Sequence, residues 1–171
     1  MKETIEKIII PTLKEVNKGI SRIVSVHTEE GNPMTKKQLS ECISGVIESK
    51  MVKVANEYGI DIIAPKVDSE PDLIVDGLPL EIKTTSGTSW RGGEYSKRSS
   101  DYLMVVYNYV DGKFNWFVLH KYLKEEDWVS SSSGNYYATS ISLDSMLDGS
   151  ILVGDKKKKR VLWHPVLENV N

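Results

Sequence analysis

Apolar residues recur every three or four positions along the first third of the chain, a spacing typical of amphipathic helices. One such stretch covers residues 3–26 and contains Pro11, which predicts a kink or a break because proline removes a helical hydrogen bond. A second stretch follows Thr35, which can form a capping box with Gln38, and Gly59 suits its end. The pattern therefore predicts helices over most of the N-terminal third.

After Gly59 the helical spacing gives way to short apolar runs that are typical of strands. The run at residues 102–107 is apolar or aromatic throughout, which predicts a strand buried on both faces. Further strands are predicted at residues 60–64, 114–119, 136–142, 151–153 and 161–164, with a helical patch at 121–127 and one helical turn at 142–147. The chain is therefore expected to mix helices and strands.

Residues 72–83 predict a β-hairpin. Asp76 and Gly77 form a favoured two-residue type I′ turn, because both positions require a positive φ. Such a turn fixes the register and places Asp72 opposite Glu81. Because side chains alternate along a strand, one face is wholly apolar and the other is polar at the end far from the turn. The apolar face carries Leu73, Val75, Leu78, Leu80 and Ile82.

The polar end of this hairpin predicts a divalent-metal site. Opposite residues on paired strands have Cβ atoms about 4.5–5.5 Å apart, and two carboxylates at that distance repel unless a cation or proton lies between them. Mg²⁺ binds oxygen ligands and commonly takes one or two carboxylates together with water and phosphate. Asp72 and Glu81 meet that need, and the backbone carbonyl of Ile82 can add a ligand. Lys83, on the same face, can orient or deprotonate a water molecule or neutralise a phosphate.

The residues Pro71-Asp72 and Glu81-Ile82-Lys83, in this order, resemble the motif of the PD-(D/E)xK nuclease superfamily, and type II restriction endonucleases are the most similar group. The resemblance covers only this short motif. It implies a restriction-endonuclease-like α/β fold, in which a mixed central sheet is flanked by helices, and a single endonuclease domain over residues 1–171. It also implies Mg²⁺-dependent cleavage of a short specific sequence in double-stranded DNA by a homodimer. Asp72, Glu81 and Lys83 are then the catalytic residues.

The family pattern often adds an acidic residue on a helix that precedes the motif, and Glu48 is the candidate here. Gly45, one turn earlier, is expected to let this helix approach the active strand. Helical geometry nevertheless places Glu48 about 130° from the centre of the apolar stripe, while Glu57 lies nearer to it and Glu41 lies on the far side. The alternative is that Glu48 is a solvated helix carboxylate.

The segment after Lys83 is the candidate DNA-contacting surface. It is rich in serine, threonine and glycine, and its three basic residues face a single acid, Glu94. Arginine can read guanine edges in a bidentate way, and serine and threonine can reach phosphates. The candidate DNA-binding residues are Ser86, Thr88, Ser89, Arg91, Lys97 and Arg98. The alternative is a flexible surface loop with Trp90 tucked onto the core.

A second basic run, residues 156–160, contains four lysines and one arginine. It is either a hairpin tip that attracts phosphates without sequence preference or a solvated turn between two strands. Because the whole chain of 171 residues carries a net charge of −2, it is not a globally basic nucleic-acid binder. Any contact with DNA must therefore use local patches.

Other site types find little support in the sequence. The single cysteine, Cys42, excludes an intrachain disulfide, and the three histidines lack metal-ligand spacing. No phosphate-binding glycine motif is present, so no nucleotide cofactor is expected. No apolar run approaches membrane-spanning length and no signal peptide is evident, so we expect no membrane partner and a cytoplasmic location.

Two other functions remain open from the sequence. One is a structure-specific repair or recombination nuclease, such as a junction resolvase or a mismatch-type nickase. The other is a DNA-binding module that does not cleave.

Overall fold

Seven strands form a mixed central sheet in the computed structural model, which describes residues 1–67, 70–92, 99–110, 113–131, 138–157, 160–162 and 164–165. The strands are β1 (Ile62–Ile63), β2 (Leu73–Val75), β3 (Leu78–Thr85), β5 (Ser100–Val110), β6 (Lys113–Leu123), β9 (Ser150–Val153) and β12 (His164–Pro165). Their order is β1-β2-β3-β5-β6-β12, and β9 also pairs with β6. The β3–β5 pair is parallel, whereas the other described pairs of this sheet are antiparallel. The predicted α/β class with a mixed central sheet and a helical N-terminal region is confirmed.

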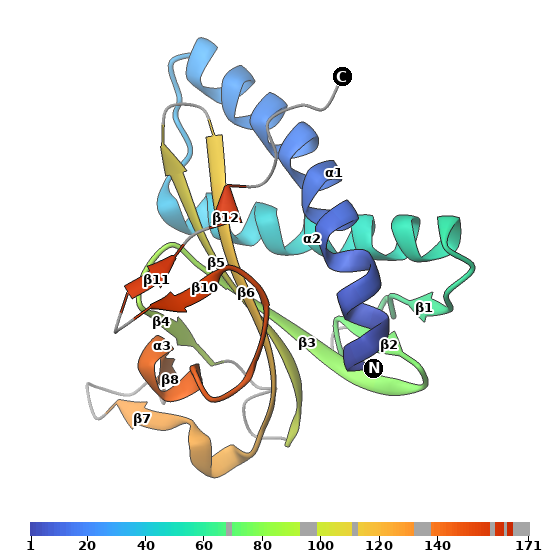
Figure 1. Ribbon diagram of the computed structural model, residues 1–171. Helices are drawn as coiled ribbons and strands as arrows, with labels where there is room; N and C mark the ends of the chain where they lie inside the picture. Colours follow the sequence, from blue (N-terminus) through green and yellow to red (C-terminus); the bar gives the residue numbers. More distant parts are fainter. Residues whose placement is uncertain are drawn as a thin grey trace.

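Two long helices, α1 (Lys2–Glu29) and α2 (Lys36–Glu57), make up the N-terminal region (Figure 1). Pro11 lies inside α1 without dividing it into two helices. The predicted capping box of α2 is present, since the Thr35 side chain accepts from the Gln38 N–H and the Gln38 side chain accepts from the Thr35 N–H. Gly59 ends α2 with a φ of 67°, a left-handed conformation that glycine adopts at little cost.

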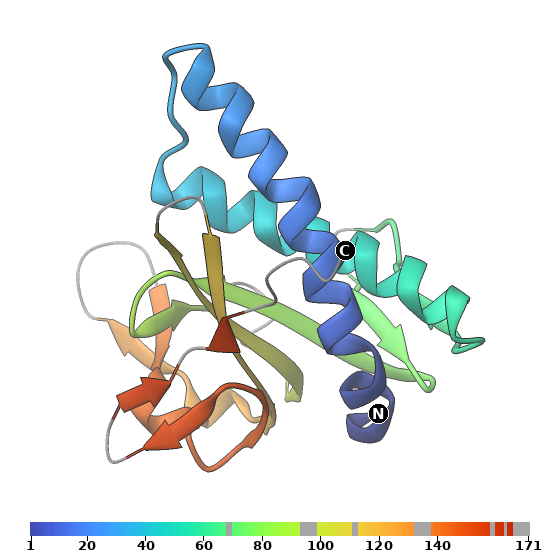
Figure 2. The same ribbon diagram turned by 45° about the horizontal axis from the view of Figure 1, so that its top comes forward.

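Both helices cover one face of the central sheet (Figure 2). The apolar residues of α1 and α2 pack against the inward side chains of β2, β3, β5 and β6 in one cluster. A polar contact fixes α1 on this face, because the Trp116 indole N–H donates to Asn17 Oδ1 at 3.0 Å. Another fixes α2, because the Thr84 hydroxyl donates to the Ser40 carbonyl at 2.9 Å.

A smaller antiparallel sheet covers part of the opposite face. It consists of β4 (Ser89–Arg91), β8 (Ala138–Ser142) and β7 (Val129–Ser131), in that order, with the short helix α3 (Leu143–Met146) after β8. Its side chains pack with the outward residues of β5 and β6 in a second apolar cluster. The side chains of residues 102–107 alternate between the two clusters and are all buried, which confirms the predicted strand buried on both faces. A separate hairpin joins β10 (Asp155–Lys157) and β11 (Arg160–Leu162).

The structure corrects one prediction in the C-terminal half. The helical patch expected at residues 121–127 is instead the end of β6 followed by a 3₁₀ turn, Glu125–Asp127. Residues 121–123 are a strand because β6 pairs with β5 as far as the Ser100/Leu123 partners. The predicted helical turn near residue 142 is present as α3, with Ser142 as its N-cap. Within the described residues, no helix combines the length and apolar composition needed to span a bilayer.

Candidate metal-binding site

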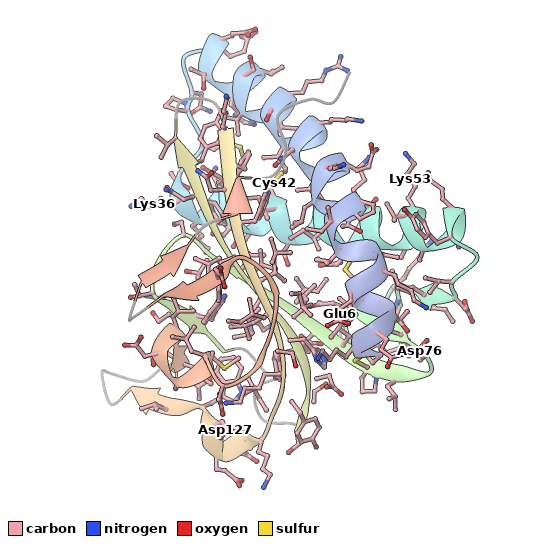
Figure 3. All side chains as sticks on the ribbon, in the orientation of Figure 1. Glu6, Lys36, Cys42, Lys53, Asp76 and Asp127 are labelled. Carbon is pink, nitrogen blue, oxygen red and sulfur yellow. The ribbon has the colours of Figure 1, made fainter. Side chains whose placement is uncertain are left out.

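The β2–β3 hairpin forms as its turn residues predict. Asp76 and Gly77 both have a positive φ, 53° and 75°, as a type I′ turn requires. The partners are Val75/Leu78, Ile74/Pro79 and Leu73/Leu80, which is the predicted register. The turn lies beside the first turn of α1, where Thr4 Oγ1 donates to Asp76 Oδ2 at 2.6 Å (Figure 3). The position of the hairpin is therefore tied to the helical layer.

Asp72 and Glu81 meet one residue beyond the last pair of the β2–β3 ladder. Asp72 Oδ2 accepts from the Ile82 N–H at 2.7 Å. In return, the Asp72 N–H donates to Glu81 Oε1 at 3.3 Å. Each carboxylate is thus bonded to the backbone of the opposite strand. These bonds hold the two acidic side chains together at the edge of β3, where β2 ends.

The Ile82 carbonyl points to the same edge. The amide and carbonyl of one residue in a strand face the same neighbour, and the Ile82 N–H faces Asp72. Continuing the register beyond Leu73/Leu80 would place Pro71 opposite Ile82. Proline has no N–H to donate to that carbonyl. The Ile82 carbonyl is therefore a candidate third oxygen ligand beside the two carboxylates.

Glu81 is a buried acid, with 2% of its surface exposed. In the parallel β3–β5 register its partner is Tyr102, a fully buried residue of the second apolar cluster. Burial, followed by the negative charge of Asp72, raises the pKa of Glu81 to about 7. Two acids whose charges disfavour each other in a site of low polarity are stabilised when a cation binds between them.

Lys83 supplies a positive charge at this site. Its ammonium lies 3.3 Å from Glu81 Oε2, and 22% of the Lys83 side chain is exposed. The Lys83 side chain therefore contacts the buried carboxylate and is partly exposed to solvent. The predicted grouping of Asp72, Glu81 and Lys83 is present in the structure as one connected set.

Glu48 lies close enough to this set for its charge to matter. Burial raises the pKa of Glu48 to about 7, the charge of Asp72 adds to the rise, and Lys83 acts in the opposite direction. The side chain is half-buried, although the helical-wheel angle favoured a solvated one. The helical wheel gives the angle of Glu48 on α2 but not what lies opposite it, and the charges of Asp72 and Lys83 act on its carboxyl group.

The position of Glu48 depends on how α2 crosses the sheet, with Lys36 and Lys53 near its two ends (Figure 3). The Thr84–Ser40 bond fixes the helix about 12 Å, or eight residues, before Glu48. The expected role of Gly45 is wrong, because this glycine is exposed and a Cβ built on it would contact no atom within 4 Å. Gly45 is not needed for a close approach of α2 to β3.

The donor set suits Mg²⁺ better than zinc. Among the described residues, no three histidine, cysteine, aspartate or glutamate side chains form a ready-made metal cluster. Mg²⁺ does not need one, since it is commonly held by one or two carboxylates while waters and substrate phosphate fill the other positions. Asp72, Glu81 and the Ile82 carbonyl fit this requirement, and Glu48 can hold a coordinated water. When ionised, the three acids of the site carry more negative charge than Lys83 alone can balance, which also favours binding of a divalent cation.

Part of the segment after Lys83 is a strand and not a loop. Ser89 and Arg91 belong to β4, which pairs with β8 through the partners Ser89/Ser142 and Arg91/Ser140. Trp90, between them, is buried, and its indole N–H donates to the Val105 carbonyl at 3.2 Å. Of the candidate DNA-binding residues, Ser86, Thr88, Ser89 and Arg91 are exposed, while Lys97 and Arg98 lie outside the described residues.

The sequence did not reveal what buries Glu81. Tyr102 and Met104 lie beside Glu81 and Lys83 in the parallel register and belong to the second cluster. The signal that could have indicated this burial was the apolar run at residues 102–107, because a strand buried on both faces requires a cover on each face. A pairing between β3 and β5 was not predictable from local patterns.

Comparison with known proteins adds no relative to this picture. No family model matches the chain, and no curated protein matches it. The functional argument therefore rests on the site itself.

Proposed function

We propose that this chain is a Mg²⁺-dependent DNA endonuclease with a restriction-endonuclease-like fold. One observation carries the proposal. The carboxylates of Asp72 and Glu81 are bonded to the backbone of each other's strands at the edge of β3, and the Lys83 ammonium lies beside Glu81. Paired acids with an adjacent, partly exposed lysine suit hydrolysis of a phosphodiester.

The reaction is attack of water on phosphorus. The water forms a new P–O bond on one side and gives up a proton to solvent, while the bond to the leaving sugar oxygen breaks on the other side and that oxygen takes up a proton. A bound Mg²⁺ supplies Lewis-acid polarisation of the phosphate and lowers the pKa of a coordinated water. Asp72 and Glu81 would hold the cation. Lys83 orients the attacking water or neutralises the phosphate, and Glu48 holds a further water.

The proposed substrate is a short specific sequence in double-stranded DNA. The exposed Ser89 and Arg91 side chains project from the same face of β4 and are candidates for groove contacts. We also propose a homodimer, because two copies of one active site are needed to cut two antiparallel strands. Action on intracellular DNA would place the protein in the cytoplasm.

Cleavage of phage DNA tests the proposal. The purified chain is incubated with a long duplex in Mg²⁺ or in EDTA, and branched DNA is supplied in parallel. Discrete fragments in Mg²⁺ are expected from the wild type and none from Asp72→Asn. Cleavage of branched DNA alone would instead identify a structure-specific nuclease. If the wild type binds duplex DNA in Mg²⁺ but cuts neither substrate, the protein is a non-cleaving module and the proposal is wrong.

A further inference from the structure

Three apolar side chains form a row on the outer face of the hairpin. Ile63 is the partner of Ile74, and Ile74 is the partner of Pro79, so the row crosses β1, β2 and β3. Their neighbours on the strands, Ile62 and Val75, point the other way into the core. The helices therefore cover one face of this corner of the sheet, and the row lies on the opposite face.

The row is accessible to solvent. Ile63 has 51% of its surface exposed, Pro79 is exposed, and Ile74 is half-buried. Single exposed apolar side chains are ordinary on protein surfaces, but three that lie side by side can mark a contact site. A contact surface gives such residues a physical reason to lie there.

The row lies on the same face as the side chains of Asp72 and Glu81, because side chains alternate along each strand. Ile74 and Pro79 stand two residues from Asp72 and Glu81 along their strands, which is about 7 Å. The grooves of B-form DNA are about 6 and about 12 Å wide, so sugars and a groove edge lie within that reach of any phosphate. A duplex whose scissile phosphate lies at the carboxylates and whose axis follows the hairpin therefore brings sugars and a groove edge onto the row.

We infer that Ile63, Ile74 and Pro79 form a contact surface for the sugar and groove wall of duplex DNA next to the scissile phosphate. The inference rests on the proposed function. The row carries no charge, so it contacts deoxyribose and base edges through apolar packing. Isoleucine and proline are among the side chains that proteins press into the minor groove. The contact contributes affinity without reading sequence.

Substitution of Ile63 by a charged residue tests this surface. If a polyanion lies against it, a negative charge weakens binding and a positive charge strengthens it. Ile63→Glu and Ile63→Lys are compared with the wild type for binding to a mixed-sequence duplex of about 30 base pairs in EDTA, where no cleavage occurs. Ile63→Glu is expected to weaken binding and Ile63→Lys to strengthen it. Ile63→Lys should also lose about threefold more affinity than the wild type between about 50 and about 200 mM salt, as one added phosphate contact requires.

Val26 provides a matched control. Its exposure is also 51%, and it lies near the end of α1 that is remote from the hairpin turn, about 33 Å from Thr4 along the helix. Val26→Glu and Val26→Lys should leave DNA binding near that of the wild type. Pro79→Glu and Pro79→Lys should repeat the opposite effects seen at Ile63, which guards against a local folding defect at one position.

Three results would overturn the inference. The first is unchanged binding by both Ile63 variants while the wild type binds normally. The second is equal weakening by both variants with a change of molecular mass in ultracentrifugation, which would make the row a contact between protein copies. In either case the nuclease proposal still stands if the wild type cuts DNA in Mg²⁺. The third is a wild type that neither binds nor cuts duplex DNA, which would remove both proposals.

Discussion

The carboxylate of Asp72 accepts a hydrogen bond from the backbone N–H of Ile82 at 2.7 Å, so one residue both extends the hairpin contacts and contributes to the candidate metal site. The two roles can be separated, because asparagine retains an oxygen that accepts this hydrogen bond but carries no charge.

Asp72→Asn is expected to abolish cleavage without loss of stability, since it keeps the bond and relieves repulsion with Glu81. Asp72→Ala should also abolish cleavage and should cost about 1.5–3 kcal/mol, the range for hydrogen bonds to charged groups. Urea denaturation in EDTA measures the difference. Asp61→Asn, at an exposed carboxylate nearby in the chain, is the control and should remain active. Full cleavage by Asp72→Asn would show that the charge is not required.

Glu48→Gln should lower the cleavage rate by at least about tenfold, as expected for a group that supports metal ligands. Its control is Glu57→Gln in the same helix, which removes only an exposed ion pair with Lys53 at 3.7 Å. Single-turnover kinetics on a cleaved duplex compare the two. Equal cleavage rates for Glu48→Gln and Glu57→Gln would show that Glu48 has no role in the reaction.

Stability in EDTA should fall as pH rises from about 4.5 to about 7. The pKa of Glu81 is raised to about 7 in the fold from an ordinary value of 4.5, so the folded chain holds more protons than the unfolded chain in this window. The same sign applies to Glu48. Thermal melts across this range, with Glu81→Gln as the comparison, isolate the effect. The wild type should lose more stability than Glu81→Gln as pH rises, and the opposite order would contradict the proposed electrostatics.

Metal binding should reverse this trend, because a cation favours the charged carboxylates. Cleavage is accordingly expected to increase as pH passes upward through the pKa values of Glu48 and Glu81, with saturating Mg²⁺ moving the midpoint to lower pH. A cleavage rate that stays constant over this pH range at low Mg²⁺ would show that ionisation of Glu48 and Glu81 is not required for the reaction.

Local rules predicted the hairpin because its information is local. Asp76 and Gly77 fix the turn, and the turn fixes the partners that bring Asp72 to Glu81. The same rules failed where distant segments decide the structure. The polar segment around Trp90 looked like a loop, but β4 forms there by pairing with β8, about 50 residues later in the chain.

Glu48 shows a second limit of local reasoning. Its angle on the helix was correct, but the edge that it faces is created by the early end of β2 and by the path of α2 across β3. Neither feature follows from the spacing of apolar residues in α2. The residue was chosen through a resemblance, and only the packing gave it a physical neighbour in Asp72.

Titration with Mn²⁺ by calorimetry, at a pH above the raised pKa values of the site, tests the metal site most directly. Wild-type protein and Glu57→Gln should bind the ion with the same affinity, whereas Asp72→Asn and Glu81→Gln should lose most of the binding. If both of those variants bind Mn²⁺ as tightly as the wild type, the carboxylates at the edge of β3 do not form the metal site.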